Sequence, residues 1–360
     1  MTKPANRFSP VKLGALCGSC FLSLTILLLA LVNLSGQTTP TESLLALSKR
    51  EHTLAIVDPV SLKVLAKAPV GDDPHEVIAS ADGKKAYVSN YGGGAFNTIA
   101  VIDLLNQKPL SPIDLGPLRG PHGLTFVAGK LWFTAEAAKA FGSYDPTSRK
   151  VDFVLGTGQN RTHMIFVAED LKRIITTNVS SGTVSIIEKV PPRAPGATSA
   201  APPRPMGPPG GDWNQTIVRV GDGSEGFDVS PDHREIWVAN AQDGTISIIN
   251  WESKAVSDTL PANVPGANRL KFTPDGRKVF VSSLRDGNLT ILDAATRKEV
   301  KRIKLGRGAA GILMQPDGAR AFVACSPDNY VAVIDLKSLE VTGKVEVGQE
   351  PDGLAWSVLH

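Results

Sequence analysis

Cysteine is almost absent from this sequence. Of three cysteines in the 360-residue chain, Cys17 and Cys20 lie in the N-terminal segment, and only Cys325 lies beyond residue 36. A single cysteine cannot close an intrachain disulfide, so packing must stabilise the fold. Cys325 ends an apolar segment and has no base beside it in sequence. We interpret it as a packed thiol and not as a nucleophile.

A surplus of either charge is also missing. The chain has 38 Lys and Arg against 35 Asp and Glu, and three of the cations (Lys3, Arg7 and Lys12) precede residue 37. The remainder therefore carries 35 charges of each sign. A neutral chain lacks the cationic surplus that holds phosphate backbones, so we expect no nucleic-acid partner.

Common catalytic motifs are missing as well. We find no G-x-S-x-G, H-E-x-x-H, P-loop or dinucleotide-binding fingerprint in a strand-to-helix context. With 42% hydrophobic and 20% charged residues, the chain is neither disordered nor a multi-pass membrane protein. Its length is sufficient to bury a sizeable core.

The N-terminal segment 1–36 predicts export. Three cations precede the apolar run 21–34, and Ser35 and Gly36 follow it, which is the layout of an export signal. The run also leaves open a retained membrane anchor. We expect a periplasmic or secreted protein that touches a membrane only through this segment, if it is not cleaved.

Internal repetition is the strongest signal beyond residue 43. Each repeat contains an apolar segment, a Val-rich segment, an alternating segment and a strand that closes in Val or Leu, usually followed by Gly, separated by turns. The repeat ends are 42 to 45 residues apart, apart from one spacing of 63. These spacings are typical of four-stranded propeller blades. One slot holds AYVSN (86–90), LWFTA (131–135), IITTN (174–178), IWVAN (236–240), VFVSS (279–283) and AFVAC (321–325).

These motifs resemble the YVTN family of β-propellers. The resemblance rests on that slot, on the PDG turns at 274–276 and 316–318, and on GTISIIN at 244–250. It covers nearly the whole chain from about residue 43, although no copy spells YVTN itself. The resemblance implies an all-β propeller and does not by itself imply an activity.

The two ends of the chain predict seven blades. Residues 44–70 offer three strands, and 351–359 offer one more. If these share a blade, the ring closes without open edges and residues 37–360 form a seven-bladed β-propeller of four-stranded blades. We expect it to be a monomer.

One insertion interrupts the repeats. Residues 191–212 are rich in Pro and Gly and contain almost no large apolar residue, so we expect a disordered or extended loop between the third and fourth strands of its blade. This loop is either a tolerated surface insertion or a segment that docks a protein partner.

Residues at the beginning of each first strand should line the mouth of the central channel. This slot holds His75, His122, His163, Glu225, Asn268, Ala310 and Asp352. Imidazoles that converge with a carboxylate are typical ligands of transition metals such as Zn or Cu. His75, His122 and His163, with Glu225 or Asp352, are therefore candidate ligands. The alternative is that each histidine only caps a strand or bonds a neighbouring blade.

Four arginines precede or adjoin these slots. Arg119, Arg161, Arg269 and Arg307 could give the channel mouth a local positive potential for an anionic ligand. Ordinary solvated loop arginines are the alternative interpretation.

Three functions remain open at this point. The first is a non-catalytic exported propeller that binds a small ligand, a metal ion or a protein partner at the channel mouth. The second is a metal-dependent hydrolase or lyase, such as a lactonase, that uses the channel histidines. The third is an interaction scaffold that uses the Pro-rich loop on the opposite face.

Overall fold

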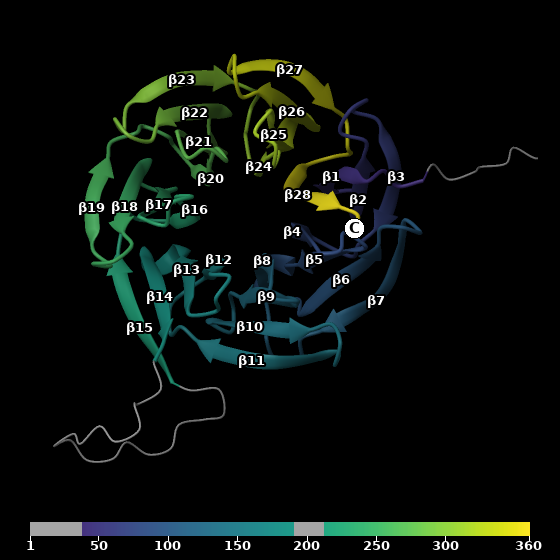
Figure 1. The fold of residues 1–360 in the computed structure, drawn as a ribbon, viewed down its shortest axis with the longest axis horizontal. Helices are drawn as coiled ribbons and strands as arrows, with labels where there is room; N and C mark the ends of the chain where they lie inside the picture. The colour runs from purple at the N-terminus through teal and green to yellow at the C-terminus, as the bar shows by residue number, and fades with distance from the viewer. Residues whose placement is uncertain (1–37, 191–211) are drawn as a thin grey trace, which may run out of the picture. The chain divides into compact units, whose positions relative to one another are not determined.

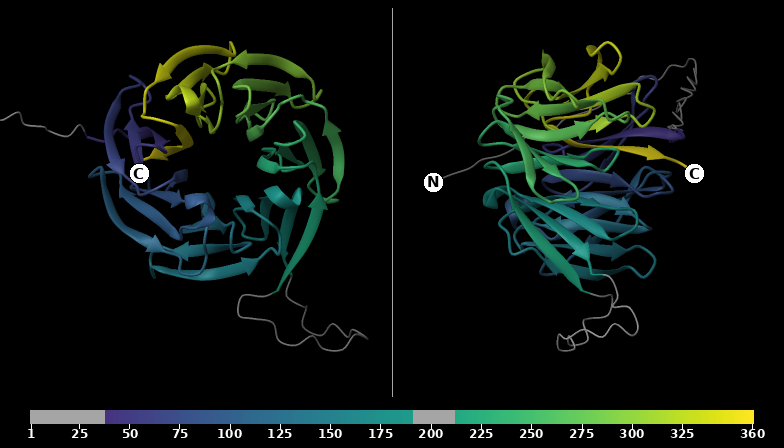
Figure 2. Two further views of the ribbon diagram at one scale, coloured as in Figure 1. Left: turned by 180° about the vertical axis from the view of Figure 1, so that it is seen from behind. Right: turned by 60° about the vertical axis from the view of Figure 1, so that its left-hand side comes forward.

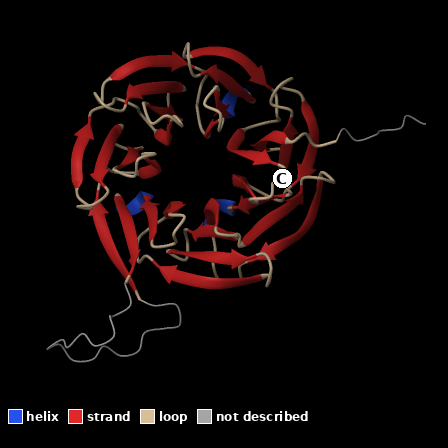
Figure 3. Ribbon diagram, viewed as in Figure 1, coloured by secondary structure: helices blue, strands red, loops and turns tan. Residues whose placement is uncertain are grey.

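The structure is a computed structural model that describes residues 38–190 and 212–360. Over these residues the secondary structure is almost entirely β-strand, with three short 3-10 helices, η1 (Gly92–Gly94), η2 (Val179–Ser181) and η3 (Ser326–Asp328) (Figure 3). None of the helices in these two ranges has the length and apolarity needed to cross a membrane. The predicted export segment 1–36 lies outside the described residues, as does the predicted insertion 191–212 apart from Asp212.

Seven four-stranded antiparallel sheets surround a central channel (Figure 1). Blade one contains β28 (Pro351–Val358), β1 (Glu42–Ser48), β2 (Thr53–Val57) and β3 (Val64–Pro69). Blade two contains β4 (Pro74–Ala79), β5 (Lys85–Asn90), β6 (Thr98–Asp103) and β7 (Lys108–Asp114). Blade three contains β8 (Pro121–Val127), β9 (Lys130–Ala135), β10 (Ala140–Asp145) and β11 (Lys150–Gly156). Blade four contains β12 (Thr162–Val167), β13 (Arg173–Asn178), β14 (Thr183–Lys189) and β15 (Trp213–Arg219).

The remaining blades follow the same order. Blade five contains β16 (Ser224–Val229), β17 (Glu235–Asn240), β18 (Thr245–Asn250) and β19 (Val256–Leu260). Blade six contains β20 (Ala267–Phe272), β21 (Lys278–Ser283), β22 (Asn288–Asp293) and β23 (Glu299–Lys304). Blade seven contains β24 (Ile312–Met314), β25 (Arg320–Cys325), β26 (Tyr330–Asp335) and β27 (Glu340–Val345). In every blade the first strand named lies innermost.

The ring closes through the two ends of the described chain, as the sequence predicts. Strand β28 pairs antiparallel with β1, from Glu42 opposite Val358 to Ser48 opposite Pro351. Closure pairs the edge of β1 that would otherwise be open, which removes a template for aggregation. The prediction of seven blades with a shared first blade is confirmed.

The core consists of seven apolar layers, each shared by two neighbouring blades. Second and third strands are covered on both faces, which is why they read as nearly continuous apolar runs and not as alternating ones. The third residue of the second strand is large in most blades. Trp132, Trp237 and Phe280 take this position and pack toward the next blade. Figure 2 shows the layered blades from behind and from the side.

The predicted insertion joins β14 to β15. Its ends are held together, because Lys189 lies opposite Trp213 in the strand register and Val190 N–H donates to the Asp212 carbonyl oxygen at 2.8 Å. The end of β14 and the start of β15 lie on the face opposite the channel mouth, because first and third strands both end on that face.

Candidate functional site

A β-bulge begins each of the three innermost strands that carry a histidine. The pairing with the second strand shifts between Pro74 and Val77, and the same shift recurs in β8 and β12. A bulge leaves two consecutive residues off the ladder and redirects their side chains. The histidines occupy the first of these two positions, which explains how they reach the channel mouth.

In blades three, four and six, a hydroxyl of the second strand fixes the bulge to the next blade. The Thr134 hydroxyl accepts the Gly123 N–H at 2.8 Å and donates to the His163 carbonyl oxygen at 2.6 Å. Thr177 repeats this bracket one blade further, where its hydroxyl donates to the Glu225 carbonyl oxygen at 2.8 Å. The Thr or Ser that precedes the last residue of the slot motif therefore positions the candidate site residues.

The three histidines form a continuous row. His75 Nδ1 lies 3.2 Å from His122 Nε2, and the rings of His122 and His163 are 3.8 Å apart between centroids. Tyr91, which follows β5, packs against two of them, with centroid distances of 4.9 Å to His75 and 5.3 Å to His122. Blades two, three and four thus bring together the three residues that the sequence placed in one slot.

His163 lies between two carboxylates. Its Nδ1 is hydrogen-bonded to Glu136 Oε1, and its Nε2 lies 3.1 Å from Glu225 Oε1 without the alignment of a hydrogen bond. Burial disfavours the imidazolium, but Glu225 and Glu136 outweigh burial and raise the pKa of His163 to about 9. In turn, His163 outweighs burial at Glu225 and lowers the pKa of that carboxyl to about 2.

His122 is the buried, neutral member of the row. Its side chain is buried, and its Nδ1 has no hydrogen-bond partner among the described residues. Burial lowers the pKa of His122 well below its ordinary value, and the neighbouring His163 and His75 lower it further. His122 is therefore a neutral imidazole with one unused ring nitrogen, which is the form that binds a metal.

Three buried residues present ligand atoms to one another. One ligand atom each from His122, Glu136 and His163 lies within 4.8 Å of the others. The Tyr91 hydroxyl donates to Glu136 Oε2 at 2.5 Å, and Arg161 Nε lies 3.3 Å from the same oxygen. Because His163 Nδ1 is bonded to Oε1, the Glu136 carboxylate is oriented through both of its oxygens.

His75 is the more exposed end of the row. Its Nε2 lies 3.0 Å from Asp73 Oδ1, and its Nδ1 lies 3.8 Å from Asp352 Oδ2. The hydrogen bond from His75 lowers the pKa of Asp73 to about 2. Lys49 Nζ lies 3.3 Å from Asp352 Oδ2, so the carboxylate that the sequence suggested as a ligand already has a cationic partner.

An ion pair crosses the channel next to the histidines. Arg269 of blade six forms an ion pair with Glu76 of blade two, and both side chains are largely buried. Burial disfavours the guanidinium, but Glu76, Asp352 and Glu225 outweigh it and raise the pKa of Arg269. Of the four predicted arginines, this one is a structural cross-channel partner with one unpaired nitrogen, Nη1.

The other three arginines do not share one site. Arg119 is exposed and donates to the Ala95 carbonyl oxygen at 2.8 Å. Arg307 lies on the other side of the ring and pairs with Asp328 at 2.9 Å. Of these three, only Arg161 adjoins both the histidine cluster and a pocket. It lines a pocket of about 340 Å³ together with Glu225, Asn268 and Arg285.

Glu136 and Tyr91 are site residues that the first-strand slot does not predict. Both occupy the position directly after a second strand, Tyr91 after β5 and Glu136 after β9. That position also lies at the channel mouth, because second strands end on the face where first strands begin. Comparing this slot between blades would have found both residues.

The comparisons with known proteins agree with this architecture. Residues 211–320 match the family model of YNCE-like β-propellers. The chain is a seven-bladed β-propeller, and this match is consistent with the YVTN-type repeat that its sequence resembles. No curated protein matches its sequence.

Solved structures share its fold at low identity. A functionally unknown protein from Desulfotomaculum acetoxidans is 13% identical with a TM-score of 0.69, over 88% of this chain and 98% of that one. A candidate 6-phosphogluconolactonase from Bacteroides fragilis is 15% identical with a TM-score of 0.66, over 89% and 99%. Kuenenia stuttgartiensis hydrazine synthase is 16% identical with a TM-score of 0.61, over 78% and 89%. At these identities the likeness concerns the fold alone.

Proposed function

We propose that this seven-bladed propeller is an exported protein that binds one transition-metal ion, zinc or copper, at the channel mouth. The observation that carries the proposal is the cluster of His122, Glu136 and His163, three buried residues whose ligand atoms lie within 4.8 Å of one another. Imidazole nitrogen and carboxylate oxygen are the donors that zinc and copper accept in proteins.

Small side-chain shifts would let the cluster hold the ion. Bonds of about 2.0–2.1 Å place tetrahedral ligands roughly 3.3 Å apart, and the three ligand atoms already lie within 4.8 Å of one another. His122 Nδ1 has no hydrogen bond to lose, whereas His163 Nε2 would give up its ion pair with Glu225 if it bound the metal. Tyr91 and Arg161 hold the Glu136 carboxylate in the way that outer partners orient metal ligands.

The remaining predicted residues take supporting roles in this proposal. His75 contacts the cluster through His122, and Glu225 contacts it through His163. Asp352 adjoins His75 and is shared with Lys49. A metal binds the neutral imidazole and not the imidazolium. Metal binding must therefore displace the extra proton that His163 carries at neutral pH.

Elemental analysis of the chain, purified without a metal-binding tag, tests the proposal. We expect about one equivalent of zinc or copper after reconstitution, and loss of that metal in a His122→Gln, Glu136→Gln double variant. His52→Gln is the matched control, because His52 lies on the exposed surface beside Asp72 and outside the cluster. Circular dichroism confirms that each variant is folded.

Two results would reject the metal site. One is the absence of stoichiometric metal in the wild-type chain at every pH from about 6 up to about 9, the pKa of His163. The other is unchanged metal content in the double variant.

A metal-dependent hydrolase, such as a lactonase, is the second candidate. The pocket of about 340 Å³ beside the cluster favours it, because Arg161, Asn268 and Arg285 could bind an anionic substrate there while Glu225 adjoins both the pocket and His163. Turnover of a lactone and ester panel by the metal-loaded chain supports this candidate. Metal binding without any turnover would leave the binding protein as the function.

A further inference from the structure

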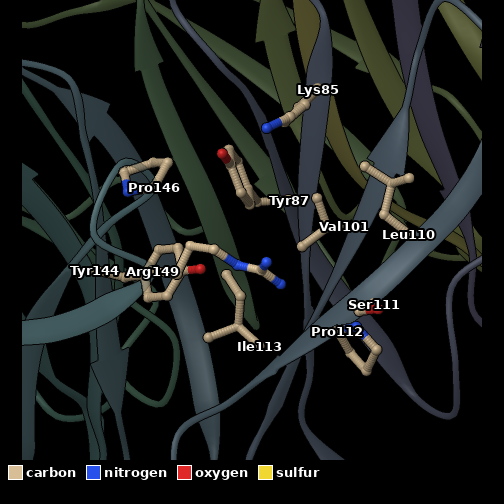
Figure 4. Close-up of a pocket in the computed structure, with 10 residues that line it drawn as sticks. All are labelled: Lys85, Tyr87, Val101, Leu110, Ser111, Pro112, Ile113, Tyr144, Pro146 and Arg149. Carbon is tan, nitrogen blue, oxygen red and sulfur yellow. The ribbon is translucent and has the colours of Figure 1, made fainter.

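A second cavity lies in the cleft between blades two and three. It has a volume of about 350 Å³, and Figure 4 shows the cationic and aromatic side chains that enter it. Its polar lining comes mainly from Lys85 and Tyr87 of blade two and from Tyr144 and Arg149 of blade three, and Val101 and Ile113 supply part of the apolar wall. No aspartate or glutamate lines it.

The polar groups of this cavity have no partners within the described part of the chain. Neither the Lys85 ammonium nor the Arg149 guanidinium forms an ion pair there, and the hydroxyl of Tyr87 makes no hydrogen bond although that side chain is buried. Asp103 lies opposite Lys85 in the strand register, but its carboxylate accepts from Asn106 N–H at 2.9 Å and from Asn106 Nδ2 at 2.7 Å. Two exposed cations, Lys85 and Arg149, therefore line the cleft without an ion-pair partner among the described residues.

The cleft between blades five and six shows how the protein neutralises the equivalent arginine there. Arg149 and Arg297 occupy the same turn before the fourth strand, with φ of 59° and 61°. Arg297 pairs with two carboxylates, at 2.8 Å from Glu235 and 2.7 Å from Asp258. Between blades five and six the arginine is thus fully neutralised by the protein itself.

Blade two replaces both of these carboxylates. Lys85 is the first residue of β5, where β17 has Glu235. Leu110 lies opposite the fourth residue of β6 in the strand register, where Asp258 lies opposite the fourth residue of β18. The repeat keeps its arginine in the blade two–three cleft but removes both of its counter-charges and adds a cation.

We propose that this cleft binds a small organic anion, with a carboxylate or phosphate group attached to an apolar body. The guanidinium of Arg149 can hold either group through two parallel hydrogen bonds, and the phenols of Tyr87 and Tyr144 are further donors. The apolar wall of Val101 and Ile113 contacts the body of the ligand. This site is separate from the channel mouth and does not depend on the metal proposal.

Calorimetric titration of the full chain with benzoate, phenyl phosphate and inorganic phosphate tests the site. We expect saturable binding of benzoate or phenyl phosphate and weaker binding of inorganic phosphate. Arg149→Gln should weaken binding roughly tenfold or more, since it removes a charged hydrogen-bond donor. Lys85→Glu should do the same, because it restores the internal counter-charge that Glu235 provides in blade five.

Lys278→Glu is the matched control. Lys278 is the first residue of β21, the same position in blade six, and does not line this cavity. This variant should bind as the wild type does. The proposal fails if none of the three probes binds saturably up to about 10 mM, or if Arg149→Gln and Lys85→Glu bind as the wild type does. Inorganic phosphate that binds as tightly as phenyl phosphate would overturn the role of the apolar wall.

Discussion

The two halves of the channel mouth share the same backbone arrangement but carry different side chains. On the histidine side, formed by blades two to four, the Thr134 hydroxyl donates to the His163 carbonyl oxygen at 2.6 Å. On the opposite side, Ser282 makes the same bond to the Ala310 carbonyl oxygen, also at 2.6 Å. The bracket thus recurs on both sides of the mouth, whatever side chain the first strand presents there. The difference shows that function in this propeller resides in a few slot residues and not in the blades.

The sharpest test of this difference removes one slot residue from each half. His163→Ala leaves Glu136 and Glu225 buried without their shared cation, and breaking a buried charge network in this way costs about 3–5 kcal/mol of unfolding free energy. Asn268→Ala should cost about 1 kcal/mol, because the Asn268 amide makes only one long hydrogen bond, 3.5 Å from Glu225. Urea denaturation in the presence of EDTA measures both. Equal losses in the two variants would contradict the proposed asymmetry.

The same network predicts how stability depends on pH. His163 has a folded pKa of about 9, above its ordinary value of 6.5, so its contribution is fully present below pH 6.5 and is lost as the pH rises through 9. Glu225 has a folded pKa of about 2, below 4.5, so its contribution is present above pH 4.5 and is lost as the pH falls toward 2.

The unfolding free energy of the metal-free chain, measured by urea denaturation, should therefore be highest between about pH 4.5 and 6.5 and should fall by a few kcal/mol toward pH 9. His163→Gln removes the group that titrates and should flatten the alkaline decline. An alkaline decline of the same size in His163→Gln would show that another group causes it.

The fold could be predicted from the sequence because its blades are copies of one sequence repeat. Apolar strand segments, glycine turns and a near-constant spacing recur in most blades, so each copy supports the others, and the closing strand follows from the three strands left at the N-terminal end. Weak copies such as IITTN (174–178) still adopt the strand because neighbouring blades bury both of its faces.

The site was predictable only where it lies in one slot. His75, His122 and His163 share a register position, and the structure brings them into one row. Glu136 approaches His163 from the neighbouring blade, and Glu76 meets Arg269 across the channel. Such contacts depend on the radius of the ring and on rotamers, and a repeat pattern within one blade contains no information on either.

The smallest expected effect comes from removing the inter-blade hydroxyl brackets, and it separates their role in stability from their role in metal binding. Thr134→Val and Ser282→Ala each remove one inter-blade bracket and leave the buried N–H that it satisfied, of Gly123 and Arg269 respectively, without a partner. Each should cost about 1–3 kcal/mol in urea denaturation, and the two losses should be similar. Only Thr134→Val should weaken metal binding, because only that bracket positions a histidine of the cluster. If Ser282→Ala weakened metal binding equally, the halves of the mouth would act as one unit and the slot residues would not be independent of the brackets.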